Sequence, residues 1–280
     1  MDTESIRSIP SNNITRNRPR NKNERVLEYF LRAISTDLRN NSSHFCEIFR
    51  SDVKNHLAKL KRKIYKKNGI NLNPLTLTSF EENNGVGTDY FDRPKIARFF
   101  YQHRYSQSIK KKSTFFKSFR VISRKNPLLL LPSEFCTLDQ KSLDDLSEKM
   151  GHDKLLYQES SISDKEADRF YRFLEKHNPD KIYEIGGFFG TDPCHSKNLL
   201  MLYNIGNIAY QEGWEALIQT VHPNQARFYE LCTPYPYHRL TPQPYIDHLN
   251  RTSITLYLDG NEFKKTFEDI QCRLEELIIE

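Results

Sequence analysis

The sequence lacks the features that mark membrane-spanning and secreted proteins. It has no run of about 18 apolar residues, the length that crosses a bilayer, and its longest purely aliphatic run is Leu128 to Leu131. The mean hydropathy is -0.72, and the N-terminus has no apolar core of the kind that a signal peptide needs. We therefore expect a cytoplasmic protein with no cleavable secretory signal and no integral membrane association.

Cysteine is also scarce, and it is scattered. The five cysteines include no C-x-x-C pair; they are Cys46, Cys136, Cys194, Cys232 and Cys272. An odd number at wide spacing favours neither a disulfide framework nor a zinc site. Because the nine histidines are equally dispersed, the sequence predicts no metal.

Charge is present but unevenly placed. The 280 residues carry a net charge of +6, and residues 50–67 contain eight Lys or Arg against the single Asp52. Such a basic surface attracts nucleic acid, anionic membranes or an acidic carrier protein, although a solvated helix face has the same composition. Because no nucleic-acid motif or aromatic interleaving accompanies the charge, we expect no nucleic-acid partner.

The stretch around which the chain is organised is Lys181 to Leu231. It predicts a strand over residues 182–189, a helix over 195–211, a second strand over 215–221 and a helix opened by Pro223. Glycine inside a strand weakens it unless a bulge or a close backbone approach is needed. The pair Gly186-Gly187 therefore indicates a ligand lying against the first strand, or else a simple turn.

Apolar periodicity predicts the remaining elements. The predicted helices are residues 24–39, 44–67, 138–150, 163–177 and 261–279, and the predicted strands are 95–103, 115–123 and 252–258. The chain then divides into a disordered basic tail (1–23), an N-terminal helix (24–43), a main domain (44–258) with a helical insertion (137–179), and a C-terminal helix (259–280).

Two motifs in the central stretch resemble a known family. Glu184-Ile185 and the run from Pro223 to Phe228-Tyr229 are similar to the pattern "E-I-S-R … x-P-x-x-x-x-F-Y" of GNAT-fold acyltransferases, in the branch of long-chain N-acyl amino acid synthases (FeeM type) and acyl-homoserine lactone synthases. Gly186 and Gly187 stand where this family has serine and arginine. The resemblance implies an α+β fold in three layers, with a mixed central sheet, flanking helices and extra helices at both ends.

The resemblance extends to possible substrate-binding residues. Lys61, with Arg62 adjacent, aligns with the arginine of the family's "L-R-Y-x-V-Y" segment, and Asp89 and Asp92 match its "E/D-x-x-D" pair. Arg120 matches the arginine of the "G-x-x-R-L" strand. Lysine keeps the charge of arginine but loses its forked geometry, so the change at residue 61 is not conservative for a bound carboxylate.

In this fold an amine attacks a thioester directly, which assigns roles by resemblance. Glu184 accepts the amine proton, backbone N–H groups from Gly186 to Phe188 hold the thioester oxygen, and Tyr229 returns a proton to the leaving sulfur. A structural interpretation remains open, in which Glu184 pairs with Arg120 and Tyr229 packs in the core.

The donor is expected to be an acyl thioester rather than a bound cofactor. The fold's coenzyme A signature is a glycine-rich turn before the central helix, and residues 192–198 contain no glycine. Relatives in this branch take acyl groups from acyl carrier protein, an acidic partner that would suit the basic residues 50–67 and Lys110 to Lys112.

These observations predict an N-acyltransferase that joins a medium or long acyl chain, from acyl carrier protein or acyl-CoA, to the amine of an amino acid or related small molecule. The alternative is a catalytically degenerate module that binds an acyl carrier or a protein partner. A bacterial effector is one form that such a module takes. The first hypothesis predicts that Arg120 and Glu184 lie on neighbouring strands with side chains on one face and that Asp89 and Asp92 join them. It also predicts that Tyr229 approaches the splay after Glu184 across a cleft.

Overall fold

The structure is a computed structural model. It describes residues 21–39, 43–49, 60, 97–104, 114–125, 130–149, 158–190, 195–248 and 250–279. Within these ranges no helix combines the length and the apolar character needed to cross a membrane.

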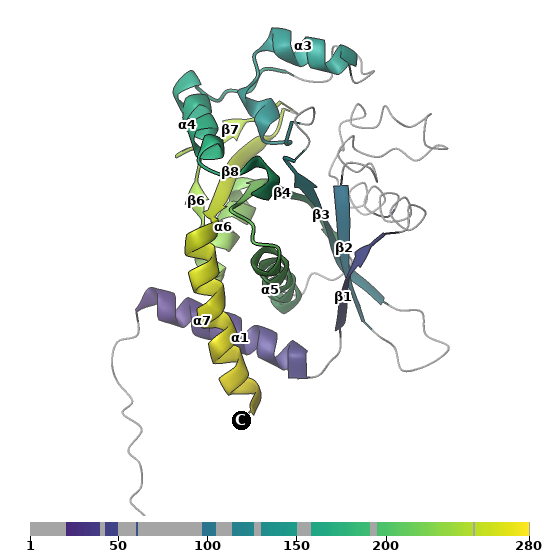
Figure 1. Cartoon of the computed structure of the whole chain (residues 1–280), viewed down its shortest axis with the longest axis vertical. Coiled ribbons are helices and arrows are strands. Elements are labelled where there is room, and N and C mark those ends of the chain that lie inside the picture. The colour runs from purple at the N-terminus through teal and green to yellow at the C-terminus, as the bar shows by residue number, and fades with distance from the viewer. Residues whose placement is uncertain are drawn as a thin grey trace, which may run out of the picture.

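The described residues form one mixed sheet of eight strands (Figure 1). Its strand order is β1-β2-β3-β4-β5-β8-β6, with β7 paired to β8. The pair β4–β5 is parallel and the other pairs are antiparallel. The bounds are β1 (Ser43–Ile48), β2 (Ala97–Arg104), β3 (Thr114–Ser123), β4 (Ile182–Gly190), β5 (Ala216–Val221), β6 (His238–Arg239), β7 (Tyr245–Ile246) and β8 (Thr252–Asp259).

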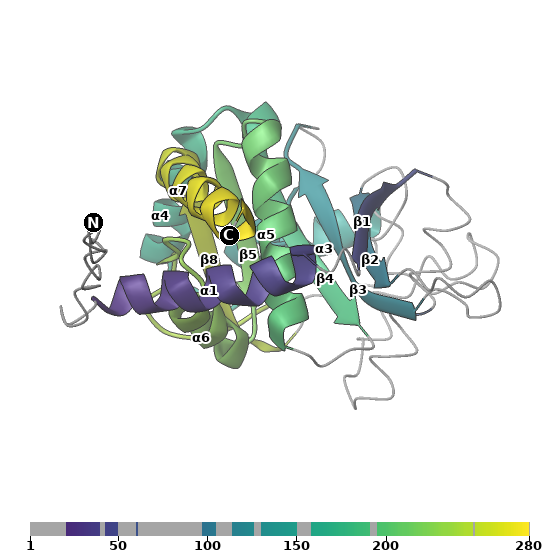
Figure 2. The same ribbon diagram turned by 90° about the horizontal axis from the view of Figure 1, so that it is seen from below.

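Helices cover both faces of this sheet. One face packs against α1 (Lys22–Arg39), α5 (His195–Gln211), α6 (Pro223–Cys232) and α7 (Gly260–Ile279), as Figure 2 shows from below. The other packs against the 3-10 helix η3 (Glu134–Thr137), α3 (Gln140–Lys149) and α4 (Asp164–Glu175); a short 3-10 turn, η5 (Pro179–Lys181), leads into β4. We call these the α5 face and the η3 face. The three-layer α+β architecture predicted from the sequence is confirmed.

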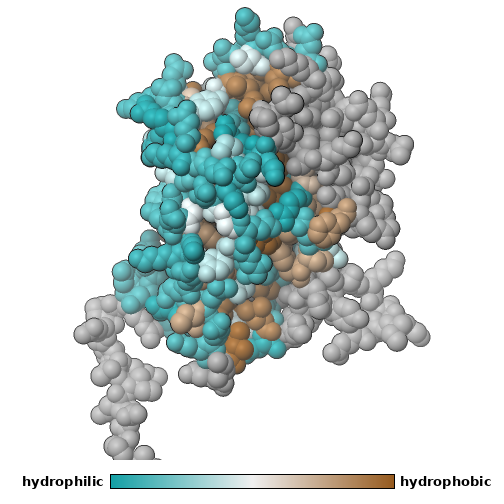
Figure 3. Space-filling view, viewed as in Figure 1, coloured by the Kyte–Doolittle hydropathy of each residue, from teal (hydrophilic) through white to brown (hydrophobic). Residues whose placement is uncertain are grey.

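Each face has its own apolar core, because alternate residues of a strand point to opposite sides of the sheet. Ile185 of β4 and Leu217 of β5 belong to the core under α5, whereas Ile182 and Ile218 belong to the core under η3. In the space-filling view of Figure 3, apolar side chains emerge between largely hydrophilic surfaces along the middle of the molecule. The two cores give every central strand residue a defined face.

The parallel pair β4–β5 is short. Its ladder has three pairs and ends at Glu184 opposite Ile218. Beyond that point β4 continues along β3 as far as Gly190, while β5 continues along β8. The sheet therefore opens between β4 and β5, and we call this opening the β4–β5 gap.

A β-bulge lies in β4 directly after the ladder ends. Arg120 of β3 pairs with Gly186 and Ser118 pairs with Phe189, so Gly187 and Phe188 together oppose Phe119. Gly187 has a φ of 61°, which only glycine adopts without strain. The bulge thus explains the glycine at position 187, whereas Gly186 keeps its place in the ladder opposite Arg120.

Most predicted elements lie within two residues of the observed ones, but one prediction is wrong. Residues 44–48, expected at the start of a helix, form the edge strand β1. Phe45 packs its ring parallel to Phe100 and Phe119, with centroids 5.8 and 6.1 Å apart, so pairing with β2 outweighs the helical spacing of the segment. Of the rest of that predicted helix, only residue 60, which is helical, and residue 49 lie inside the described ranges.

Candidate active site

Glu184 lies where the sheet opens, on its η3 face. Its partners across the two ladders are Ile122 of β3 and Ile218 of β5, both members of the core on that face. The side chain is only 3% exposed. A carboxylate at such depth needs specific partners, because removing it from water is costly.

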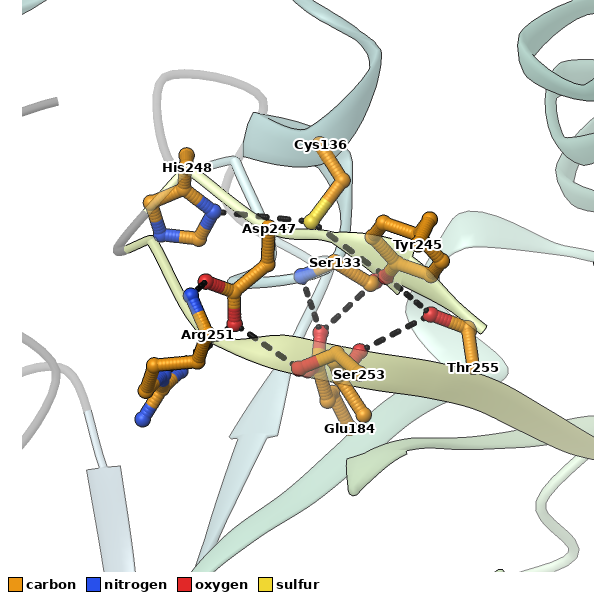
Figure 4. Close-up of polar contacts among 10 residues, drawn as sticks. Ser133, Cys136, Glu184, Tyr245, Asp247, His248, Arg251, Ser253 and Thr255 are labelled. Carbon is orange, nitrogen blue, oxygen red and sulfur yellow. Dashed lines mark hydrogen bonds and ion pairs between the residues drawn. The ribbon is translucent and has the colours of Figure 1, made fainter. Parts of the chain in front are cut away.

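The partner of Glu184 is the turn that precedes η3 (Figure 4). The backbone N–H of Ser133 donates to Oε2 at 2.9 Å and the Ser133 hydroxyl donates to the same oxygen at 2.8 Å. Glu134 holds this turn in place, since its carboxylate accepts from the Leu131 N–H at 2.8 Å and from the Arg124 guanidinium at 2.9 and 3.1 Å. Both of these donors reach Oε2, and in the described part of the chain no further donor to the Glu184 carboxylate is found.

These surroundings set the protonation behaviour of Glu184. Burial raises the pKa of its carboxyl to about 7, although the Ser133 hydrogen bonds and the positive charge of Arg120 act in the opposite direction. The nearby carboxylate of Glu134 adds to the rise. A carboxyl group that titrates near neutral pH is suited to accept a proton as a general base.

Arg120 lies beside Glu184 on the same face of the sheet. The strands β3 and β4 are hydrogen-bonded neighbours, and Arg120 and Glu184 belong to the alternate set of residues that includes Ile122. A methyl group added at Gly186 would lie 3.7 Å from Nε of Arg120 and 3.8 Å from a terminal nitrogen, so the guanidinium passes over Gly186. This placement on neighbouring strands and one face agrees with the sequence prediction.

Tyr229 lies on the opposite face. It projects from α6 into the core under α5, where its ring is 5.3 Å from that of Tyr237. Burial raises the pKa of its hydroxyl, and the neighbouring amide of Gln219 partly offsets this effect. The parity of the strands thus places Tyr229 and Glu184 on different sides of the sheet. The approach of Tyr229 to the splay after Glu184 across a cleft stays a prediction.

Gln219 of β5 lies on the α5 face where the β4–β5 gap begins. Gln219 is the first β5 residue beyond the ladder; its side chain points to the α5 face and is fully buried. Within the described residues neither amide atom of Gln219 makes a hydrogen bond of good geometry. Its amide still lies close enough to the Tyr229 hydroxyl to lower the pKa of that group.

Gly187 and Phe188 form the bulge beside Glu184. The extra residue of a bulge leaves the regular ladder. Phe188 stays close to β3, with its ring 5.7 Å from that of Phe119. An arginine at position 187 would be strained at this φ, which accounts for the departure from the family pattern.

The remaining predicted site residues lie outside the described ranges. These are Lys61, Arg62, Asp89 and Asp92. Their approach to Arg120 and Glu184, and with it the full predicted charge cluster, stays a prediction. Within the described part of the chain no three His, Cys, Asp or Glu side chains are grouped to hold a metal ion.

Sequence reasoning missed a polar cluster on the η3 face. Figure 4 shows Cys136, Tyr245, His248 and Thr255 pointing toward one another beside Ser133 and Glu184. They come from η3, β7, the following turn and β8. The only sequence signal is the polar residue type at buried strand positions such as Thr255, and burial is not visible in a sequence.

Comparison with known proteins gives similarity at the level of solved structures. FeeM, an N-acyl amino acid synthase from uncultured soil microbes, aligns with a TM-score of 0.49 and 11% identity over 80% of this chain and 93% of that chain. The CoA-dependent acyl-homoserine lactone synthase BjaI aligns with a TM-score of 0.48 and 12% identity over 83% and 90%. The acyl-homoserine lactone synthase LasI aligns with a TM-score of 0.47 and 9% identity over 81% and 96%. No family model and no curated protein sequence matches the chain.

Proposed function

We propose that the protein is an N-acyltransferase that moves a medium or long acyl chain from acyl carrier protein, or from acyl-CoA, to the amine of an amino acid or related small molecule. The observation that carries the proposal is Glu184: a buried carboxyl whose pKa is raised to about 7, placed where the β4–β5 gap begins. A general base of that pKa at an opening in the sheet is what amine acylation requires.

In this proposal the amine is deprotonated on the η3 face of the sheet, and the leaving thiolate is protonated from the α5 face. The amine approaches from the η3 face, where Oε1 of Glu184 accepts a proton from nitrogen. The thioester enters the gap, with its carbonyl oxygen held by a backbone N–H of the bulge at Gly187 and Phe188. Nitrogen attacks the carbonyl carbon, the carbon–sulfur bond breaks, and Tyr229 protonates the thiolate from the α5 face.

Charge on the η3 face suits an amino acid as acceptor. Arg120, beside Glu184, is positioned to bind the carboxylate of such a substrate, and a guanidinium does so in a forked geometry. Lys61, Arg62, Asp89 and Asp92 are proposed to complete this subsite. Support for the acidic donor protein comes from the basic composition of residues 50–67.

One observation favours a second candidate, a module that binds an acyl carrier without turnover. Gly187 replaces the arginine of the family pattern, so a positive charge expected beside Glu184 is absent from that position. In that case Glu184 has no catalytic role, and its substitution does not change the binding of the acyl carrier.

A product screen tests the proposal. Purified protein is incubated with acyl carrier protein and CoA thioesters of several chain lengths and a panel of amino acids, and N-acyl products are identified by mass spectrometry. We expect at least one N-acyl amino acid, lost in Glu184→Gln and kept in the surface control Glu268→Gln. If no product forms across the panel, the proposal is wrong; binding of acyl carrier protein that is equal in wild type and Glu184→Gln would then favour the module.

A further inference from the structure

A continuous chain of hydrogen bonds crosses the η3 face from β5 to a buried histidine. Thr220 Oγ1 lies 3.1 Å from Thr255 Oγ1, which lies 2.7 Å from the Tyr245 hydroxyl. That hydroxyl donates to Cys136 Sγ at 3.4 Å, and the sulfur lies 3.4 Å from His248 Nδ1. Figure 4 shows the part from Thr255 to His248 as one line of contacts.

Hydrogen-bond direction is consistent along the chain. The Tyr245 hydroxyl donates to Cys136 Sγ, and the His248 backbone also hydrogen-bonds to this thiol. Transfer along the chain requires the thiol proton to point to His248 Nδ1, which lies 3.4 Å away. Tyr245 then accepts from Thr255, and Thr255 accepts from Thr220. Hydroxyl and thiol groups both donate and accept, so a proton taken up at one end can be passed on by successive transfers. Burial raises the pKa of the Cys136 thiol to about 12, which keeps it protonated and able to donate.

The chain of hydrogen bonds begins at the site of the proposed reaction. Thr220 lies two residues beyond Ile218, the last β5 residue of the β4–β5 ladder, and therefore faces the same side as Glu184. Thr220 is half-buried, whereas Thr255, Tyr245, Cys136 and His248 are all buried. The chain thus connects the open end of the gap with an interior imidazole and excludes bulk water from the intermediate steps.

We propose that Thr220, Thr255, Tyr245, Cys136 and His248 form a proton relay that accepts a proton from the substrate amine and delivers it to His248. This inference rests on the proposed acyl transfer. Near neutral pH the amine of an amino acid is mostly an ammonium ion, so two protons must leave nitrogen as the N–C bond forms. Glu184 has room for one of them, and the relay takes the other.

The proton count closes. One nitrogen proton moves to Glu184 and the second to Thr220 Oγ1, while each relay group donates its own proton onward and His248 becomes an imidazolium. The carbon–sulfur bond breaks and the thiolate takes the Tyr229 proton. Glu184 and His248 then release one proton each, of which one restores Tyr229 and the other leaves to solvent.

Charged neighbours of His248 support a proton resting there. Asp247, adjacent in sequence and fully buried, accepts from Ser253 at 2.9 Å and from the Arg251 side chain at 3.0 and 3.1 Å. The carboxylate of this adjacent residue attracts a positive charge on the imidazole. From the other elements, His248 faces Cys136 of η3 and Tyr245 of β7, and Glu184 of β4 lies close enough to influence the thiol.

Matched substitutions at Cys136 test the relay. Cys136→Ala interrupts the chain and Cys136→Ser keeps a group that donates and accepts, so we expect kcat to fall by about tenfold or more in the alanine variant and to recover in the serine variant. The loss should be greatest at low pH, where the ammonium form dominates, and should shrink as pH rises. Tyr245→Phe should repeat the alanine result if Cys136→Ala folds poorly, and the exposed-cysteine control Cys272→Ala should behave as wild type.

Outcomes for the relay and for the proposed function are separable. Wild-type transfer with equal kcat and equal pH profiles in Cys136→Ala and Cys136→Ser overturns the relay and leaves acyl transfer intact; absence of wild-type transfer overturns the function. An activity-independent measurement decides the chain's direction. In nitrogen-15 NMR spectra His248 should be the tautomer with hydrogen on Nε2 and a bare Nδ1, and a proton found on Nδ1 of the resting protein would contradict the relay.

Discussion

Glu184 and Glu212 are two glutamates that differ in burial and in partners: Glu184 is buried, whereas the Glu212 side chain is 34% exposed. Glu212, directly after α5, accepts two hydrogen bonds of 2.7 Å from Arg98 and one of 3.0 Å from the Trp214 indole. Burial raises its pKa, but these hydrogen bonds prevail and hold the pKa below its ordinary value. Glu184 receives only neutral Ser133 donors among the described residues, and its pKa is raised to about 7.

This difference separates a carboxylate with a structural role, Glu212, from the carboxyl group that we propose as the general base, Glu184. Arg98 also binds Glu47 of β1 at 2.7 and 2.9 Å, so the Glu212 site ties an edge strand to the end of α5. A permanently charged glutamate serves that purpose. At Glu184 the incomplete compensation by Arg120 keeps the carboxyl able to take and release a proton near neutral pH.

The largest expected effect is on catalysis. Glu184→Gln keeps the acceptor oxygen for Ser133 but cannot take a proton, so kcat/KM should fall by about 10²–10⁴. Glu212→Gln should leave the kcat/KM of folded protein unchanged. Steady-state rates with the acyl donor and amine found by the product screen measure both, and equal losses would erase the distinction between the two sites.

The next effect concerns stability against pH. Glu184 has a pKa near 7 in the folded protein against an ordinary value of 4.5, so its protonated form favours folding. This contribution is full below about pH 4.5 and is lost as pH rises through 7. Glu184→Gln is neutral at every pH and should gain on wild type by about 3 kcal/mol over that window.

Urea unfolding of both proteins at pH 5 and pH 8 measures this gain. The same window predicts that wild-type kcat/KM declines below pH 7, as Glu184 becomes protonated. A free-energy difference that does not change with pH would show that Glu184 titrates normally.

A smaller effect is expected from breaking the Glu212 site. Arg98→Met leaves two carboxylates without their shared guanidinium, and about 1–3 kcal/mol of unfolding free energy should be lost, since the group is partly exposed and screened. The control Arg273→Met removes a surface pair with Asp269 and should cost less than about 0.5 kcal/mol. Thermal unfolding compares them; equal costs would mean that the Arg98 cluster is no stronger than a surface pair.

The smallest expected effect concerns two glycines with positive φ, one near each glutamate. Gly187 lies in the bulge with a φ of 61°, and Gly213 ends α5 with a φ of 62°. Alanine at either should cost about 1–2 kcal/mol of stability, whereas Gly186→Ala, with only ordinary contacts to Arg120, should cost less. Only Gly187→Ala should also lower kcat. A similar loss of kcat in Gly213→Ala would show that the bulge has no specific role in the reaction.

The sequence predicted those features that depend on local pattern. The order of strands and helices after residue 181 follows from apolar spacing, and the glycine pair was identified from its strand position. Glu184 and Arg120 were identified through the resemblance of their motifs to a known family. The edge strand β1 was missed because its pairing with β2, more than 50 residues later, decides its conformation. The relay was missed for the same reason, since packing alone brings Cys136 to His248, 112 residues apart.

The face of Tyr229 was also beyond sequence reasoning. A helix after a strand can cross either side of a sheet, and the motif that contains Tyr229 is identical in both cases. Only the assignment of Leu217 and Ile218 to different cores shows which side α6 covers.

The three-pair ladder between β4 and β5 has a consequence for cohesion. The sheet consists of two halves, β1 to β4 and β5 to β8, and the short β4–β5 ladder joins them. A thioester in the β4–β5 gap would contact both halves of the sheet at the point where β4 and β5 are no longer hydrogen-bonded to each other. It would therefore link the two halves for as long as it is bound. Because such a ligand binds only the folded chain, its binding would stabilise the fold. The proposed substrate would then add to the stability of the sheet that binds it.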